Sequence, residues 1–107
     1  MSASAITWTG ESGSGYEYWI YPVGTAFRAV AGNYIFSKRG SDGLWYAVYI
    51  GETADLSSRF NQHHQARCIR LAGATHIHVH SSPNGADLRR AEETDLRARY
   101  RPACNLQ

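Results

Sequence analysis

The sequence GNYIF at residues 32–36, followed by VYIGET at residues 48–53, decides the fold predicted for this chain. Both runs are rich in aromatic and β-branched residues, which is typical of short strands. The polar KRGSDG at residues 38–43 between them has the composition of a turn. We therefore predict an antiparallel hairpin, with Gly51 at the point where its second strand leaves the sheet. A glycine there tolerates a positive φ or a close backbone approach, and it leaves room for a ligand.

The chain after residue 53 changes from strand to helix periodicity. Asp55 can cap a helix, and apolar and basic side chains then recur at steps of three and four. This pattern predicts a helix over residues 55–67, on which Arg59 and His63 lie one above the other. A further short helix is expected up to residue 71, where Gly73 ends it.

The alternating segment at residues 76–80 predicts another strand, with its two aliphatic residues facing inward and its three histidines facing outward. Imidazole binds zinc, nickel and copper, so His76, His78 and His80 are a candidate transition-metal site. Alternate strand positions are about 7 Å apart, so two neighbours would bind one ion and another ligand would have to complete the shell. The simpler interpretation is an exposed or interfacial strand face.

Composition limits the class of protein. The 107 residues suit one domain, and the net charge of +2 is unevenly spread. Residues 1–58 hold three Lys or Arg against five acids, whereas residues 59–107 hold eight arginines against four acids. An arginine-rich half suits phosphate, because guanidinium presents a bidentate fork, although a solvated basic helix is an equally simple interpretation. We expect no membrane segment, two reduced thiols at Cys68 and Cys104, and a cytoplasmic location.

The motifs together resemble those of the GIY-YIG nuclease superfamily. Residues 32–34 are similar to its first motif, with Asn33 in place of the usual isoleucine, and residues 49–51 are similar to its second. The run YIGETADLSSRFNQH at residues 49–63 resembles the family's succession of Tyr-Ile-Gly, helix, Arg and His. The run EETDLRARYRPACN at residues 92–105 resembles its closing pattern, in which a glutamate precedes a leucine by three positions, a proline by nine and an asparagine by twelve.

The resemblance implies site residues, and two choices among them stay open. The closing pattern selects Glu93 as the ligand of one Mg²⁺ or Mn²⁺, while helical periodicity keeps Glu92 as the alternative. A phenol has a pKa near 10 and is a poor base at pH 7, so His63 is chemically the easier base. The implied catalytic residues are Tyr34, Tyr49, Arg59 and His63, with Gly32 and Gly51 as motif backbone, Glu93 as metal ligand and Asn105 as the residue that orients the site.

The fold that the resemblance implies is α+β, with a small central antiparallel sheet of about three strands flanked by helices. This GIY-YIG-like domain covers residues 31–107. Residues 1–30 lie outside it, and their aromatic runs predict an extra N-terminal β-hairpin with a connector. We expect this hairpin to pack on the sheet or on a second copy of itself, with stacking on bases as the alternative.

The implied function is a divalent-metal-dependent endonuclease that hydrolyses DNA phosphodiester bonds. The arginine would stabilise the charge of the transition state, the glutamate would hold the metal, and the tyrosines with the histidine would activate water. The alternative is a catalytically weak or inactive nucleic-acid-binding or interaction module with the same fold, using the histidine strand as a metal site. A module this small has little surface for reading sequence, so specificity would need a homodimer or a partner domain.

Overall fold

The computed structural model describes residues 4–60 and 63–106 of the chain. Within these residues, four strands are followed by a short helix, a fifth strand, a long helix and a terminal 3-10 turn. The elements are β1 (Ser4–Thr9), β2 (Gly15–Pro22), β3 (Gly32–Arg39), β4 (Trp45–Thr53), α1 (Ala66–Leu71), β5 (His76–Ser81), α2 (Ala86–Tyr100) and η1 (Ala103–Asn105).

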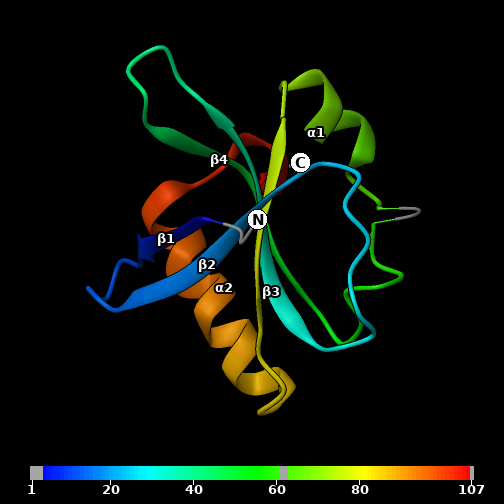
Figure 1. Cartoon of the computed structure of the whole chain (residues 1–107). Coiled ribbons are helices and arrows are strands. Elements are labelled where there is room, and N and C mark those ends of the chain that lie inside the picture. The colour runs from blue at the N-terminus through cyan, green and yellow to red at the C-terminus, as the bar shows by residue number, and fades with distance from the viewer. Residues whose placement is uncertain (1–3, 61–62, 107) are drawn as a thin grey trace.

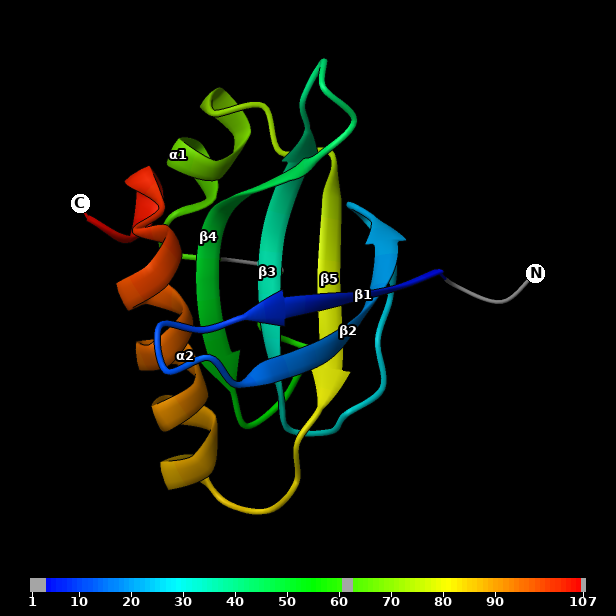
Figure 2. The same cartoon turned by 90° about the vertical axis from the view of Figure 1, so that its left-hand side faces the viewer.

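The strands of the described residues form one curled, antiparallel, five-stranded sheet in the order β1-β2-β5-β3-β4 (Figure 1). The prediction of about three strands flanked by helices is therefore wrong. The reason is the pairing of β2 with β5, which places Trp19 opposite Val79 and Tyr21 opposite Ile77. This long-range pairing makes the N-terminal hairpin part of the main sheet and not an extra element. Figure 2 shows the hairpin folding across the sheet, with α2 running beside β4.

The predicted hairpin of β3 and β4 is confirmed. Tyr34 lies opposite Gly51, and Phe36 lies opposite Tyr49. β4 continues to Thr53, so the expected exit from the sheet at Gly51 is wrong by two residues. Gly51 is not among the glycines of the described residues that have a positive φ. Glycine is needed there because another group lies close to its backbone, and not because of an unusual backbone angle.

The two faces of the sheet bury two separate apolar clusters. Alternation along the strands sends Tyr34 and Phe36 to one face, where Ile77 and Ile69 join them, and Ile35 to the other. The first cluster lies under α1 and the segment after β4. The second cluster lies under α2 and the folded-over hairpin, and it contains Trp8, Tyr18, Ile35, Ile50 and Leu96.

His78 lies in this second cluster, so the prediction of three outward histidines is wrong. Its side chain is fully buried, because the β1–β2 hairpin covers that face. The indole of Trp8 donates a hydrogen bond to His78 Nδ1 at 2.9 Å, and Nε2 lies 2.8 Å from Ser37 Oγ. Burial lowers the pKa of His78 to about 4, so the imidazole is neutral at pH 7.

The predicted helix over residues 55–67 is wrong over residues 55–60, and within its described part only residues 66 and 67 are helical, as the start of α1. Residues 56–60 are turns, and residues 61–62 lie outside the described part. Asp55 Oδ1 accepts hydrogen bonds from the Ser57 backbone N–H and hydroxyl, at 2.9 and 2.6 Å, so its cap closes a local turn. Serine side chains compete with the helical backbone in this way. The shorter helix before Gly73, whose φ is 86°, is confirmed as α1.

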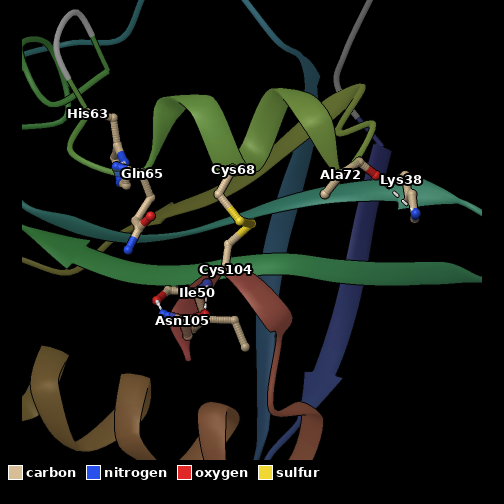
Figure 3. Close-up of a disulfide and its surroundings, with 8 residues drawn as sticks. All are labelled: Lys38, Ile50, His63, Gln65, Cys68, Ala72, Cys104 and Asn105. Carbon is tan, nitrogen blue, oxygen red and sulfur yellow. Dashed lines mark hydrogen bonds between the residues drawn. A yellow bond between two sulfur atoms is a disulfide. The ribbon is translucent and has the colours of Figure 1, made fainter. Parts of the chain in front are cut away.

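A disulfide joins Cys68 of α1 to Cys104 of η1, with the Cα atoms 5.8 Å apart (Figure 3). The expectation of two reduced thiols is therefore wrong. Their separation of 36 residues gave no hint of contact, which arises because folding brings α1 and η1 close together. Among the helices of the described residues, none is long and apolar enough to cross a membrane.

Candidate active site

Tyr34 is the centre of the candidate site. It is fully buried in the middle of β3, and its ring lies across Gly51 of the neighbouring strand. A Cβ atom at Gly51 would lie 2.6 Å from the Tyr34 hydroxyl and 2.9 Å from Tyr49 Cε1. The room that the sequence predicted beside Gly51 is thus occupied by the phenol of Tyr34. Both motif tyrosines therefore depend on the absence of a side chain at this glycine.

Two side-chain nitrogens from the segment that follows β4 lie within hydrogen-bond distance of the Tyr34 hydroxyl oxygen. Arg59 Nε donates to it at 3.1 Å, and His63 Nε2 lies 2.7 Å away. The Gln65 backbone N–H donates to His63 Nδ1 at 3.0 Å. A neutral imidazole carries one proton, so Nδ1 as acceptor requires the proton on Nε2. His63 therefore donates to Tyr34, and in this tautomer it cannot accept the phenol's proton.

Burial sets the protonation states of this pair. It lowers the pKa of His63 to about 4, with the charges of Arg59 and His64 acting in the same direction. Burial also raises the pKa of Tyr34 well above its ordinary value, and the hydrogen bond and charge of Arg59 only partly oppose this. At pH 7 the resting site consequently holds a neutral phenol, a neutral imidazole and one guanidinium.

Tyr49 lies on the same face and links the site to a second histidine. Its ring stacks beside Tyr34, with centroids 6.1 Å apart, and its hydroxyl lies 3.4 Å from His64 Nε2. Burial and the charge of Glu93 raise the Tyr49 pKa, whereas Arg59 and a hydrogen bond with Tyr34 lower it. The rings of His63 and His64 are stacked 4.7 Å apart. His64 is exposed.

Glu93 belongs electrostatically to this group. It is partly buried on α2, and burial raises the pKa of its carboxyl group. The positive charges of Arg97 and Arg59 act in the opposite direction and lower this pKa. Its charge in turn raises the pKa of Tyr49. Arg97, one helical turn along, has its Nη1 atom 3.8 Å from Glu93 Oε1. The Glu93 carboxylate is thus electrostatically coupled to Arg59 and to the phenols of Tyr34 and Tyr49.

Glu92 has a different environment. Its Oε2 atom accepts hydrogen bonds from the Tyr18 hydroxyl at 2.5 Å and from His80 Nε2 at 2.6 Å, on the opposite face of the sheet. The Glu92 side chain is 8% exposed. It serves as the internal partner of two buried or half-buried groups, which satisfies a carboxylate that would otherwise be costly to bury. Glu92 and Glu93 thus have different direct partners, since Glu93 pairs with Arg97.

Glu52 is the second carboxylate near Glu93, and an arginine holds it. Arg89 Nε donates to Glu52 Oε2 at 3.0 Å, and both side chains are largely buried. Glu52 contributes to the raised pKa of Glu93. This ion pair ties β4 to α2 beside the site. The Asn33 amide, in place of the motif isoleucine, adds a second tie by donating to the Arg89 carbonyl at 2.9 Å.

Asn105 orients β4 from the C-terminal end of the chain. Its Oδ1 accepts from the Ile50 N–H at 2.7 Å, and its Nδ2 donates to the Ile50 carbonyl at 2.8 Å (Figure 3). Both hydrogen bonds fix the backbone of Ile50, which lies between Tyr49 and Gly51. The neighbouring Cys104 carries the disulfide to α1, which follows the histidine pair. One end of the chain therefore fixes both the strand and the helix that flank the site.

The remaining predicted positions lie apart from this cluster. Gly32 permits close packing of β3 on β5, because a Cβ there would lie 2.4 Å from the His80 carbonyl oxygen. His76 Nδ1 lies 2.8 Å from Thr75 Oγ1, and His78 uses both ring nitrogens internally. In the described part of the chain, no group of three or more His, Cys, Asp or Glu side chains is arranged to hold a metal ion.

Three contributors to the site were missed at the level of sequence: His64, Arg89 and the disulfide. The adjacency of two histidines was a signal for His64, but the buried role of Arg89 looked like one of many helix charges. Comparison of the chain with models of known protein families, with curated proteins and with solved structures finds no match.

Proposed function

We propose that this protein is a divalent-metal-dependent endonuclease of the GIY-YIG type that hydrolyses DNA phosphodiester bonds. The observation that carries the proposal is the meeting of Tyr34, Arg59 and His63 at one phenol oxygen, beside Tyr49 and within electrostatic reach of Glu93. The motifs are local patterns, whereas this meeting depends on long-range folding. The two lines of support are therefore distinct.

Arg59 is the group that stabilises the transition state. Cleavage builds negative charge on the phosphoryl oxygens, and a fixed guanidinium in a partly buried site stabilises that charge more strongly than it would in water. The Nε atom of Arg59 is held by Tyr34, which fixes the direction of the guanidinium. Its planar fork can then donate to two phosphate oxygens at once.

Tyr49 is the phenol best suited to take a proton from water. Tyr34 accepts two hydrogen bonds, one from His63 and one from Arg59. The hydrogen bond between Tyr34 and Tyr49 lowers the pKa of Tyr49. As the water proton moves to the Tyr49 oxygen, the Tyr49 proton moves to His64 Nε2, 3.4 Å away. His63 is a positioning residue in this scheme, because it fixes Tyr34.

The metal would be held by Glu93. The donor set around it fits Mg²⁺ or Mn²⁺, which bind through one or two carboxylates and complete their shell with water and substrate phosphate. When bound, such an ion acts as a Lewis acid that stabilises the leaving oxygen. Because Glu52 is held by Arg89, one carboxylate is available, and we expect the ion to bind weakly until DNA supplies phosphate ligands.

The test is plasmid cleavage with Mg²⁺ or Mn²⁺. We expect wild-type protein to nick the plasmid, and we expect Arg59→Ala and Glu93→Gln each to lower the rate by at least about a hundredfold, the size of effect seen when a group that stabilises the transition state is removed. Glu92→Gln is the matched control: it should lower the midpoint of urea unfolding and leave the rate per folded molecule nearly unchanged. Absence of cleavage by the wild type with every metal would refute the proposal.

The second candidate is a module that binds nucleic acid without cutting it. The observation in its favour is that the carboxylate of Glu52, which contributes to the raised pKa of Glu93, is already paired with Arg89. A single carboxylate gives weak metal binding, which limits turnover. Retention of DNA by the wild type at low salt, with no nicking at millimolar Mn²⁺, would favour this module. If this second candidate is correct, Glu93→Gln should not change the affinity for DNA.

A further inference from the structure

A cavity of about 440 Å³ lies next to the candidate active site, between the connector after β2, the turns after β4 and α1. Its volume is in the range typical of small-molecule sites. Its walls are mostly aromatic and aliphatic, and they include Phe27, Phe36, Leu56, Phe60, Ile69 and Ile77. None of these residues has a catalytic role in the proposed mechanism.

The cavity shares two structural components with the site. His63 lines it while its ring nitrogens bind Tyr34 and the Gln65 backbone, so the imidazole presents only carbon atoms and its ring face to the cavity. Phe60 forms another wall. Its ring packs edge-on against Tyr34 at 4.9 Å and against Phe27 at 5.7 Å between centroids. A ligand in the cavity would thus lie one aromatic ring away from the central phenol.

The charged group at the cavity is a single exposed arginine, Arg70. Across residues 4–60 and 63–106, no ion pair or side-chain hydrogen bond involves its guanidinium. A ligand that satisfies both features has a planar apolar body and an anionic group. The excess of arginine over acidic residues in residues 59–107 favours a nucleotide of a nucleic-acid strand as the source of that anion.

We propose that this cavity receives the base of an unpaired nucleotide in the bound DNA strand, with a flanking phosphate on Arg70. The base would stack against the phenylalanine rings, as bases do on aromatic residues of single-strand-binding proteins. A paired base is held in the helix and cannot enter, so the cavity selects DNA with a bulge, a flap or a mismatch. The inference rests on the proposed nuclease function, and it defines the substrate class of that site.

The experiment measures binding without cleavage. Fluorescence anisotropy in EDTA compares a duplex with one unpaired adenine, the same duplex with an abasic residue there, and a fully paired duplex. We expect the unpaired adenine to bind about tenfold more tightly than the abasic residue, which matches the loss of one stacked base. Equal affinity for all three duplexes would overturn the proposal. Because no divalent ion is present, this outcome is independent of whether the protein cleaves DNA.

Two substitutions locate the site. Ala74→Leu places extra apolar volume in the cavity, and Arg70→Gln removes its charge; each should reduce the preference for the unpaired adenine to less than about threefold. Arg67→Gln is the matched control, because Arg67 is also an exposed arginine of α1 but lies away from the cavity. It should weaken binding to all three duplexes equally and retain the preference. Circular dichroism checks that each variant folds.

Adenosine 5′-monophosphate tests the source of the nucleotide. We expect it to compete with the bulged duplex only at concentrations at least about a hundredfold higher, because the strand adds phosphate contacts. Competition at equal concentration would assign the cavity to free nucleotides and overturn the proposal. An unchanged preference in the Ala74→Leu and Arg70→Gln variants would also overturn it, since the recognition would then lie elsewhere on the protein.

Discussion

Loss of the Cys68–Cys104 disulfide should remove a large fraction of the stability of this domain. The cross-link closes a loop of 36 residues. The loop-closure model gives an entropy loss in the unfolded chain of about 13 cal/mol/K for this length, or about 4 kcal/mol at 25 °C. A domain of 107 residues is stabilised by roughly 5–15 kcal/mol in total. The reduced protein should therefore be folded but close to its limit at 37 °C.

Packing of the sulfur atoms adds a second, separable contribution. Cys104 is fully buried in the first cluster, so its replacement by alanine leaves a small cavity that costs about 1 kcal/mol. The reduced wild type loses only the cross-link, whereas the Cys68→Ala/Cys104→Ala variant loses both the cross-link and the packing. We expect the two to differ by about that amount, with the variant less stable.

Urea unfolding followed by tryptophan fluorescence measures both effects. We expect the free energy of unfolding to fall by about 4 kcal/mol on reduction and by about 5 kcal/mol in the double variant. The slope with urea should rise, because the unfolded chain without the cross-link exposes more surface. A difference below about 1 kcal/mol between oxidised and reduced protein would refute the loop-closure reasoning, since it would mean that the unfolded chain is already compact.

Two further predictions concern protons and backbone packing. His63 and His78, whose pKa values burial lowers to about 4, stay neutral when folded, so below pH 6.5 the unfolded chain binds protons that the folded chain does not. The free energy of unfolding should therefore be highest above about pH 6.5 and should fall as the pH is lowered toward 4. The two histidines together account for a fall of up to about 4 kcal/mol at pH 5, which the raised pKa of Glu93 partly offsets. An unchanged urea midpoint between pH 7 and pH 5 would contradict this. Gly51→Ala should displace the Tyr34 phenol, lower the free energy of unfolding by about 1–3 kcal/mol and raise the His63 pKa measured by NMR. An unchanged His63 pKa in this variant would show that the Tyr34 phenol keeps its place beside His63.

Much of the secondary structure was predictable because its signals are local. The aromatic and β-branched runs at residues 32–36 and 48–53 correctly predicted the central hairpin, and the alternation at residues 76–80 correctly predicted β5. The helix expected over residues 55–67 was wrong over residues 55–60, because Asp55 and Ser57 close a turn with their own side chains. A capping residue and helical spacing do not reveal that competition.

The candidate site shows the same division. The motif spacing selected Tyr34, Arg59 and Glu93 from sequence, while helical periodicity kept Glu92 as the alternative to Glu93. The fold separates the two carboxylates, because adjacent helix positions point about 100° apart and the α2 helix lies at the edge of a curled sheet. Glu92 accepts a hydrogen bond from the Tyr18 hydroxyl, whereas Glu93 is paired with Arg97 and electrostatically coupled to Arg59.

The sequence by itself determined the order of the strands along the chain, the excess of arginine in the second half and the residue types from which a phosphodiesterase site can be built. Only the tertiary structure decided that β2 pairs with β5, that Cys68 meets Cys104, and which nitrogen of His63 carries the proton. The physical reason is range. Periodicity and turn chemistry act over a few residues, whereas sheet order, a cross-link and a tautomer depend on groups that folding brings together from distant parts of the chain.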